Sequence, residues 1–205
     1  LPILYELMER ITSAFPDVLF EGCSGGGGRF DAGFAYYMPQ IWTSDNTDAV
    51  SRLTIQYGTS LVYPISMTTA HVSAIPNHQT GRKTSFETRG NAAMSAVFGY
   101  ELDLTKMSQE DKDQVKEQVA CYKEIRKLIQ YGNFYRLKSP VETNQAAWMF
   151  VSDDKRDVCV MTFQVLAFAQ PCLTKTKLFG LDPELEYENL ETHEIFGGDE
   201  LMELG

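Results

Sequence analysis

The sequence predicts an α/β chain that ends in an antiparallel β region, and three observations carry this prediction. Up to about residue 132, short apolar strands alternate roughly four times with segments of helical periodicity. After Pro140 the pattern changes to short strands separated by turns. Of the 205 residues, 43% are hydrophobic and 22% are charged, a globular composition that excludes a largely disordered chain.

Residues that favour helix boundaries support the elements predicted in the first region. Pro16 ends the first helix, and Gly58 is placed to end a later one. Ser108 to Asp111 is a capping box with Asp in place of Glu or Gln, and Gly132 closes the helix that it opens. The expected elements are, in order, a helix over residues 1–14, a strand over 17–23, a glycine-rich loop over 24–31, a strand over 40–45, a helix over 49–57, a strand unit over 62–71, a helix over 87–97, a strand over 99–104 and a helix over 108–132.

The second region reads as antiparallel strands. They are expected over residues 147–151, 158–167, 176–179 and 185–188, with a hairpin or strand end over 194–199.

About four βα units amount to half of a (β/α)8 TIM barrel, a fold that normally takes ~250 residues. Half a barrel leaves open parallel edges and an uncovered core. We therefore predict two domains, half of a barrel over residues 1–135 and an incomplete antiparallel β-domain over 141–205. The chain is expected to be a piece of something larger or to pair with another piece.

Charge and composition exclude several classes of partner. Eighteen Lys and Arg stand against 28 Asp and Glu, for a net charge of −10, so nucleic acid and anionic membrane are not expected partners. No stretch approaches the ~20 apolar residues of a spanning helix. The four cysteines are scattered, which favours free thiols in a reducing compartment, the cytoplasm, and offers no zinc site. They are Cys23, Cys121, Cys159 and Cys172.

Asp45 is the first candidate for chemistry, because it falls at the carboxyl end of a predicted strand. Barrel enzymes keep their catalytic groups at that end. A partly desolvated carboxyl beside Trp42 would serve as a general acid. The alternative is that Asp45 or Thr47 caps the following helix, with Asp48 in its first turn.

The glycine-rich loop after the first strand lacks both phosphate-binding patterns, because no Lys-Ser/Thr follows it and no acidic residue closes a second strand. A flexible surface loop and a ligand contact remain open interpretations. Cys23 has no histidine beside it in the local pattern, so a passive thiol is favoured over a nucleophile. Arg29 either pairs with Asp31 and fixes the loop, or orients a carboxylate.

Hydrogen-bonded structural roles are the default for the histidines of the third unit, His71 and His78. Several aromatic residues stack on a sugar face or belong to the core. They are Phe30, Phe34, Tyr36, Tyr37 and Trp42.

Six segments, in the same order and nearly end to end, resemble the bacterial α-galactosidases of glycoside hydrolase family 36. They are Phe-Pro-Asp-Val-Leu-Phe-Glu-Gly-Cys-Ser-Gly-Gly-Gly-Gly-Arg-Phe-Asp at residues 15–31, Pro-Gln-Ile-Trp-Thr-Ser-Asp-Asn-Thr-Asp at 39–48, and the runs at 55–64, 71–82, 99–104 and 197–202.

The resemblance implies retaining hydrolysis of terminal α-galactosyl groups from sugars such as melibiose or raffinose. Retaining glycosidases use two carboxyls ~5 Å apart, one as nucleophile and one as acid and then base. Asp45 matches the family's acid/base, and Cys23 and Gly26 match its contacts to the 2-hydroxyl of the sugar. The residues that the resemblance assigns to substrate binding are Cys23, Ser24, Gly26, Arg29 and Trp42.

The family's nucleophile is an Asp in a Lys-Trp-Asp motif, which does not occur here. Asp31 is not its substitute, since the family keeps that Asp alongside the nucleophile. The chain thus resembles only the last four barrel units and part of the terminal β-sandwich. We expect the isolated chain to be unable to complete a retaining cycle.

The resemblance leaves alternatives within and outside carbohydrate chemistry. A galactosyltransferase related to raffinose synthase and an α-N-acetylgalactosaminidase are the first two, although a small thiol and glycines favour a 2-hydroxyl over an acetamido group. A noncatalytic galactoside-binding or assembly module is the third. No cofactor or metal is expected, and the full-length protein is expected to form a homo-oligomer, such as the tetramer common in the family.

Overall fold

The computed structural model describes residues 2–28, 30–170 and 173–205. The chain forms two compact units, Leu1–Val115 and Lys116–Gly205. The domain limits predicted from the sequence, 1–135 and 141–205, remain a prediction. In the part of the chain that the structure describes, no helix is both long and apolar enough to cross a membrane.

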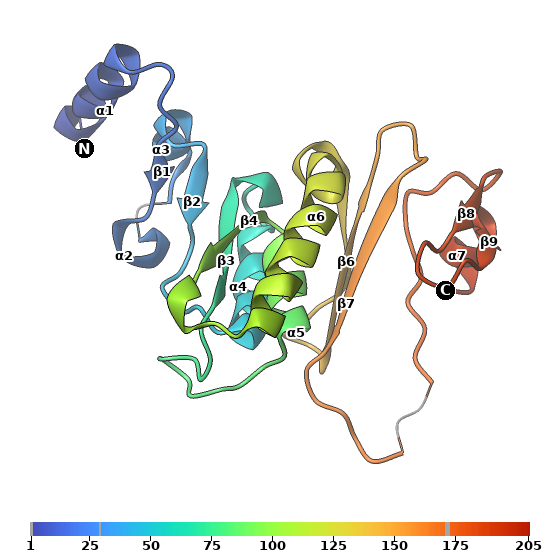
Figure 1. The fold of residues 1–205 in the computed structure, drawn as a ribbon. Coiled ribbons are helices and arrows are strands. Elements are labelled where there is room, and N and C mark those ends of the chain that lie inside the picture. Colours follow the sequence, from blue (N-terminus) through green and yellow to red (C-terminus); the bar gives the residue numbers. More distant parts are fainter. Residues whose placement is uncertain (1, 29, 171–172) are drawn as a thin grey trace. The chain divides into compact units, whose positions relative to one another are not determined.

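The first unit is built on a four-stranded parallel sheet, so the prediction of an α/β chain is confirmed (Figure 1). Its strands lie side by side in sequence order: β1 (Glu21–Gly22), β2 (Gln40–Trp42), β3 (Thr68–Ser73) and β4 (Val97–Glu101). Each adjacent pair is parallel. The carboxyl ends of all four strands therefore lie at one edge of the sheet, together with the loops that follow them.

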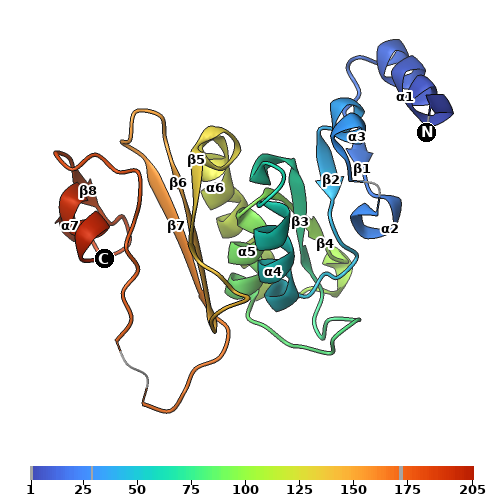
Figure 2. The ribbon, with the colours of Figure 1, turned by 180° about the vertical axis from the view of Figure 1, so that it is seen from behind.

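Helices separate these strands and cover the sheet. Both α4 and α5 pack against β3 and against each other (Figure 2). The buried hydrophobic residues of this unit include Ile41, Leu53 and Val72, each at most 2% exposed. The helices of the unit are α1 (Pro2–Ala14), α2 (Ser24–Gly27), α3 (Ala32–Tyr37), α4 (Ala49–Thr59) and α5 (Phe86–Met94), with 3-10 turns at Ile65–Met67 and Leu104–Lys106.

Several predicted boundaries were wrong. The first strand is two residues long instead of seven, and the glycine-rich loop contains the short turn α2. The helix α3 was missed; its six residues are too few to show an apolar stripe. Helix α4 continues through Gly58 to Thr59. The strand expected over 99–104 instead spans Val97–Glu101, because the Asp103 carboxylate accepts the Thr105 N–H at 3.0 Å and begins a 3-10 turn.

The long helix α6 (Gln109–Tyr131) begins and ends where local sequence signals place it. The Ser108 hydroxyl accepts the Asp111 N–H at 3.0 Å and donates to the Asp111 carboxylate at 2.9 Å. At the other end, a Cβ on Gly132 would lie 2.5 Å from the Leu128 carbonyl oxygen. Only glycine fits this helix end, which is why the sequence reveals it.

The second unit contains an antiparallel sheet of β5 (Asn133–Lys138), β6 (Gln145–Val151) and β7 (Val158–Gln164), followed by a hairpin of β8 (Glu186–Glu188) and β9 (Ile195–Gly197) and by α7 (Gly198–Glu203). One buried hydrophobic cluster of this unit consists of Met149, Val151, Leu178 and Leu181. The antiparallel character was predicted correctly. Strand β5 and helix α7 were missed, and residues 176–179, expected as a strand, form none.

The central strand β2 provides a test of this packing. Ile41 is 1% exposed, so Ile41→Ala should lower the free energy of unfolding by about 2–5 kcal/mol. The matched control is Ile3→Ala on α1, where the side chain is 83% exposed and the change should stay within ~0.5 kcal/mol. Urea unfolding followed by tryptophan fluorescence measures both, and equal losses would contradict this assignment of the core.

Candidate active site

Asp45 lies three residues beyond the end of β2, at the carboxyl edge of the parallel sheet, as predicted. Its side chain is exposed. The indole N–H of Trp42 donates to its Oδ1 at 3.2 Å. Asp45 does not cap α4, so the structural alternative for this residue was wrong. A carboxylate fixed by one hydrogen bond and open to solvent is able to exchange a proton with a ligand.

Trp42 is held in place by two further side chains. The imidazole of His71 stacks on its ring with centroids 4.6 Å apart and an angle of 20° between the planes. The guanidinium of Arg52 lies 4.4 Å from the centroid of the ring. Trp42 is 9% exposed, so its ring is core and its N–H is the part directed at Asp45.

Arg52 joins the loop after β2 to strand β3. It is 2% exposed, and it donates to the Ser44 carbonyl oxygen at 3.0 Å and to the Thr69 carbonyl oxygen at 2.7 Å. Burial lowers its pKa to about 10, which still leaves the guanidinium charged at neutral pH. Sequence reasoning missed this residue. The available signal was its place in the stripe 49, 52, 53 and 56, which has the spacing of a buried helical face.

The glycine-rich segment after β1 packs directly on the backbone after β2. Gly25, Gly26 and Gly27 have φ angles of +68°, +70° and +82°, a conformation that disfavours other residues. A Cβ on Gly26 would lie 2.6 Å from the Asp45 nitrogen, and one on Gly27 would lie 2.8 Å from the Thr43 carbonyl oxygen. Close approach of two backbones therefore explains these glycines, and the thiol of Cys23 beside them is exposed.

Three other polar residues in the range 24–31 were singled out from the sequence: Ser24, Arg29 and Asp31. Ser24 is the first residue of α2, whereas Arg29 lies outside the described residues. Asp31 caps α3, because its carboxylate accepts the Phe34 N–H and the Tyr5 hydroxyl, both at 2.8 Å. These two hydrogen bonds lower the pKa of Asp31. Asp31 thus has a structural explanation.

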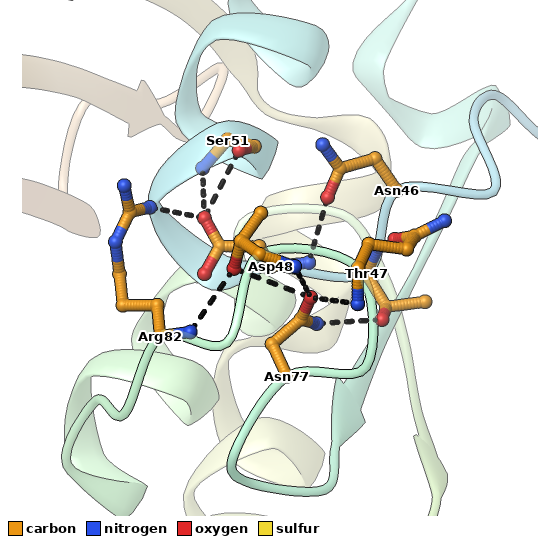
Figure 3. Close-up of polar contacts among 8 residues, drawn as sticks. Asn46, Thr47, Asp48, Ser51, Asn77 and Arg82 are labelled. Atoms are coloured by element: carbon orange, nitrogen blue, oxygen red, sulfur yellow. Dashed lines mark hydrogen bonds and ion pairs between the residues drawn. The ribbon is translucent and has the colours of Figure 1, made fainter.

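Asp48 is the residue that caps α4, and Figure 3 shows its partners. Its carboxylate accepts the N–H and the hydroxyl of Ser51, both at 3.0 Å, and forms an ion pair with Arg82. The side chain is 2% exposed. The structural role expected for Asp48 is confirmed, although it lies at the cap and not inside the helix.

The loop after β3 contacts the Asp45 loop through side chains that sequence reasoning missed. The Asn77 amide donates to the Thr47 hydroxyl at 2.9 Å (Figure 3). The Gln79 amide accepts the Thr47 N–H at 3.0 Å and donates to the Asp45 carbonyl oxygen at 2.6 Å. No local pattern reveals these contacts, since they join residues 30 to 34 positions apart.

Of the two histidines of the third unit, His71 has a second neighbour besides Trp42. Its Nδ1 lies 3.8 Å from the Glu101 carboxylate, too far for a hydrogen bond. His71 is therefore a packing residue, but its buried Nδ1 lacks the hydrogen bond that was expected, and no partner for it exists among the described residues. His78 is exposed on the loop.

The aromatic candidates do not form one platform. Phe30 stacks on Tyr63 with centroids 4.0 Å apart, and Phe34 is 5% exposed in the core. Tyr37 stacks on Tyr5, whereas Tyr36 is exposed.

Within residues 2–28, 30–170 and 173–205, no group of three His, Cys, Asp or Glu side chains is placed to hold a metal ion. Cys23, Cys121 and Cys159 are free thiols, and Cys172 lies outside the described residues. Burial raises the pKa of Cys159 to about 11, and it also raises the pKa of Cys121. Raised pKa values make these two thiols poor nucleophiles.

Two family models match the chain. Residues 2–132 match the melibiase family, and residues 145–205 match the glycosyl hydrolase family 36 C-terminal domain.

Curated relatives share most of this sequence. The chain is 68% identical over 202 residues to alpha-galactosidase 1 of Pediococcus pentosaceus, which covers 98% of this chain and 28% of that protein. An alpha-galactosidase of Lactobacillus acidophilus is 62% identical over 201 residues, covering 98% of this chain and 27% of the relative. The chain thus spans between a quarter and a third of the length of these relatives.

Solved structures also resemble nearly the whole of this chain, which again corresponds to only part of their length. A variant of a family 36 alpha-galactosidase of Geobacillus stearothermophilus in complex with raffinose has a TM-score of 0.96 and 60% identity, over 98% of this chain and 28% of that one. Another variant of that enzyme, in complex with stachyose, also has a TM-score of 0.96, at 61% identity over the same shares.

The close approach of the glycine segment to Asp45 can be tested with a matched pair. Gly25 and Gly26 have nearly the same φ, but a Cβ on Gly25 would meet nothing within 4 Å. We expect Gly25→Ala to lower the free energy of unfolding by about 1–2 kcal/mol, the cost of the left-handed conformation. Gly26→Ala should cost about 2–5 kcal/mol, because overpacking adds to that cost.

Chemical denaturation measures this difference, and a crystal structure of Gly26→Ala should show the backbone at Asp45 displaced. Equal losses in the two variants would mean that the segments do not press on one another.

Proposed function

This chain belongs to glycoside hydrolase family 36, and we propose that it supplies the acid/base side of a retaining α-galactosidase active site. The observation that carries the proposal is the exposed Asp45 carboxylate, held by Trp42 at the carboxyl edge of a parallel sheet. Catalytic groups of barrel enzymes occupy this edge. The nucleophile, a second aspartate, is expected in residues of the full-length protein outside this chain.

In the first step, the nucleophile's carboxylate forms a bond to C1 of the galactosyl group. The bond from C1 to the leaving oxygen breaks, and protonated Asp45 gives its proton to that oxygen. The products are a covalent galactosyl-enzyme, the released sugar or alcohol, and an Asp45 carboxylate. The Trp42 N–H stabilises the ionised carboxylate by a charge-assisted hydrogen bond.

In the second step, Asp45 acts as the base. Its carboxylate takes a proton from water, the water oxygen forms a bond to C1, and the bond from C1 to the nucleophile breaks. Galactose leaves with its α configuration retained, and Asp45 is protonated again. Proton transfer by a positioned carboxyl needs no cofactor.

We propose that galactose is bound beside Asp45 by the glycine-rich segment. In this proposal Cys23 and Gly26 contact the 2-hydroxyl, and the packing of Gly26 against the backbone of Asp45 supports it. Contacts to this hydroxyl strengthen as the sugar approaches an oxocarbenium ion, so they lower the barrier. Ser24, Arg29 and Trp42 complete the proposed binding set.

The substrates that we propose are α-linked galactosides of the melibiose and raffinose type. The solved complexes of the Geobacillus enzyme with raffinose and stachyose support this substrate class. We further infer that β1 to β4 are the last four strands of a (β/α)8 barrel, and that the second unit is part of a β-sandwich. A homo-oligomer of the full-length protein is part of the proposal.

The role of Asp45 is tested by Asp45→Asn in the full-length protein. We expect kcat/KM for melibiose to fall by about 10²–10⁴-fold, the usual contribution of general acid–base catalysis. Galactose release measures the loss, and Lys83→Ala, an exposed residue on the neighbouring loop, is the control that keeps activity. Unchanged hydrolysis by Asp45→Asn would rule out the proposed role.

The 205-residue chain alone should show no turnover of an aryl α-galactoside, because a retaining cycle needs two carboxyls. Release of the aryl alcohol is the measurement. Turnover that disappears with Asp45→Asn would mean that a second carboxyl of this chain completes the site, and the assignment of the nucleophile to other residues would be wrong.

A further inference from the structure

The loop at residues 77–82, which we call the clamp loop, bonds to the backbone of the Asp45 loop. The Gln79 side-chain amide donates to the Asp45 carbonyl oxygen and accepts the Thr47 N–H, at 2.6 and 3.0 Å. One amide thus bonds the Asp45 loop as a neighbouring strand would, with one donor and one acceptor. Two further contacts flank it, Asn77 with the Thr47 hydroxyl and Arg82 with the Asp48 carboxylate.

The base of the clamp loop is fixed, so the Gln79 amide is presented in a defined direction. Asn77 is 5% exposed, and its side-chain oxygen accepts the N–H groups of Gln79 and Thr80, both at 3.0 Å. The backbone N–H of Asn77 donates to the Arg82 carbonyl oxygen at 2.9 Å, which closes the loop. Because Asn77 holds the backbone of Gln79, the Gln79 side chain can restrain the Asp45 loop that it contacts.

The carboxylate of Asp45 needs such a restraint because the side chain is exposed. Its direction depends on the two peptide groups that flank its Cα. Arg52 holds the first at the Ser44 carbonyl, and Gln79 holds the second at the Asp45 carbonyl. Arg52 is buried, so its loss would disturb the core, whereas Gln79 is exposed. Gln79 is therefore the residue whose contribution can be separated from folding.

We propose that Gln79 is a positioning residue for proton transfer by Asp45. The inference rests on the proposed acid/base role of Asp45. A general acid must lie within about 2.6–3.2 Å of the oxygen that it protonates, and a misplacement of ~1 Å can cost about 10²-fold in rate. Loss of Gln79 should consequently weaken protonation of the leaving group and leave galactose binding intact.

The test compares two substrates in the full-length protein. Melibiose has a sugar as leaving group and needs protonation, whereas a dinitrophenyl α-galactoside has a leaving group that departs without it. For Gln79→Ala we expect kcat/KM to fall by about 10-fold or more with melibiose and less than 2-fold with the dinitrophenyl galactoside. Gln79→Glu, which keeps the acceptor for Thr47 and loses the donor to Asp45, should show the same selective loss.

Each other outcome overturns the proposal in a recognisable way. Equal losses with both substrates would indicate a structural role, and a rise in KM shared by both would place Gln79 against the sugar. Wild-type behaviour of both variants would remove any role. Lys83→Ala on the same stretch of chain should leave both substrates unaffected. If Asp45→Asn itself had no effect on melibiose, the proposed function would fail instead, so the two failures are distinguishable.

Discussion

The buried guanidinium of Arg52 is the interaction on which the candidate site depends. It places a full charge, 2% exposed, between carbonyl oxygens from the loop after β2 and from β3, and beside the ring of Trp42. A buried charge costs less free energy when it is hydrogen-bonded. Two nitrogens of Arg52 donate to backbone carbonyl oxygens and the guanidinium lies over an aromatic ring, whereas its buried Nε has no hydrogen-bond partner among the described residues. The same side chain contacts Ser44 and Trp42, which both precede Asp45 in the sequence. Asp45 is thus held from its amino-terminal side by a buried group, although it is itself exposed.

Backbone packing completes what Arg52 begins. Two glycines in the left-handed region, Gly26 and Gly27, let the segment after β1 approach the backbone at residues 43–45 more closely than any side chain would allow. The clamp loop contributes bonds from the opposite neighbour, β3. The loops after β1 and β3 therefore both contact the Asp45 loop after β2. Such contacts are expected in a parallel sheet, because the loops after its strands all lie at the carboxyl edge. These contacts together fix the position of the Asp45 backbone, although each of them alone contributes little free energy.

Features of the fold and the site could be predicted from the sequence when the interactions that determine them join residues close together in the chain. Helix α6 was predictable because Ser108 and Gly132 act within a few residues of its ends. The place of Asp45 at a strand end was predictable for the same reason, but residue patterns alone left its role open, and the family resemblance decided it. Arg52 and Gln79 were missed because their partners lie 8 to 34 positions away and exist only after folding. The capping role of Asp31 was missed because the helix that it caps is too short to show a periodic pattern.

The second carboxyl of a retaining cycle determines which part of the proposed catalysis this chain can supply. A retaining glycosidase needs two carboxyls ~5 Å apart, one that attacks C1 and one that gives and then takes a proton. The described residues hold Asp45 through the Trp42 N–H and through the contacts of Arg52 and Gln79 with its neighbouring carbonyl groups. A charge-assisted hydrogen bond from Trp42 suits the ionised carboxylate that remains after the first step. In the proposed mechanism this chain therefore contributes the geometry of proton transfer, whereas the covalent step depends on a second carboxyl expected outside it.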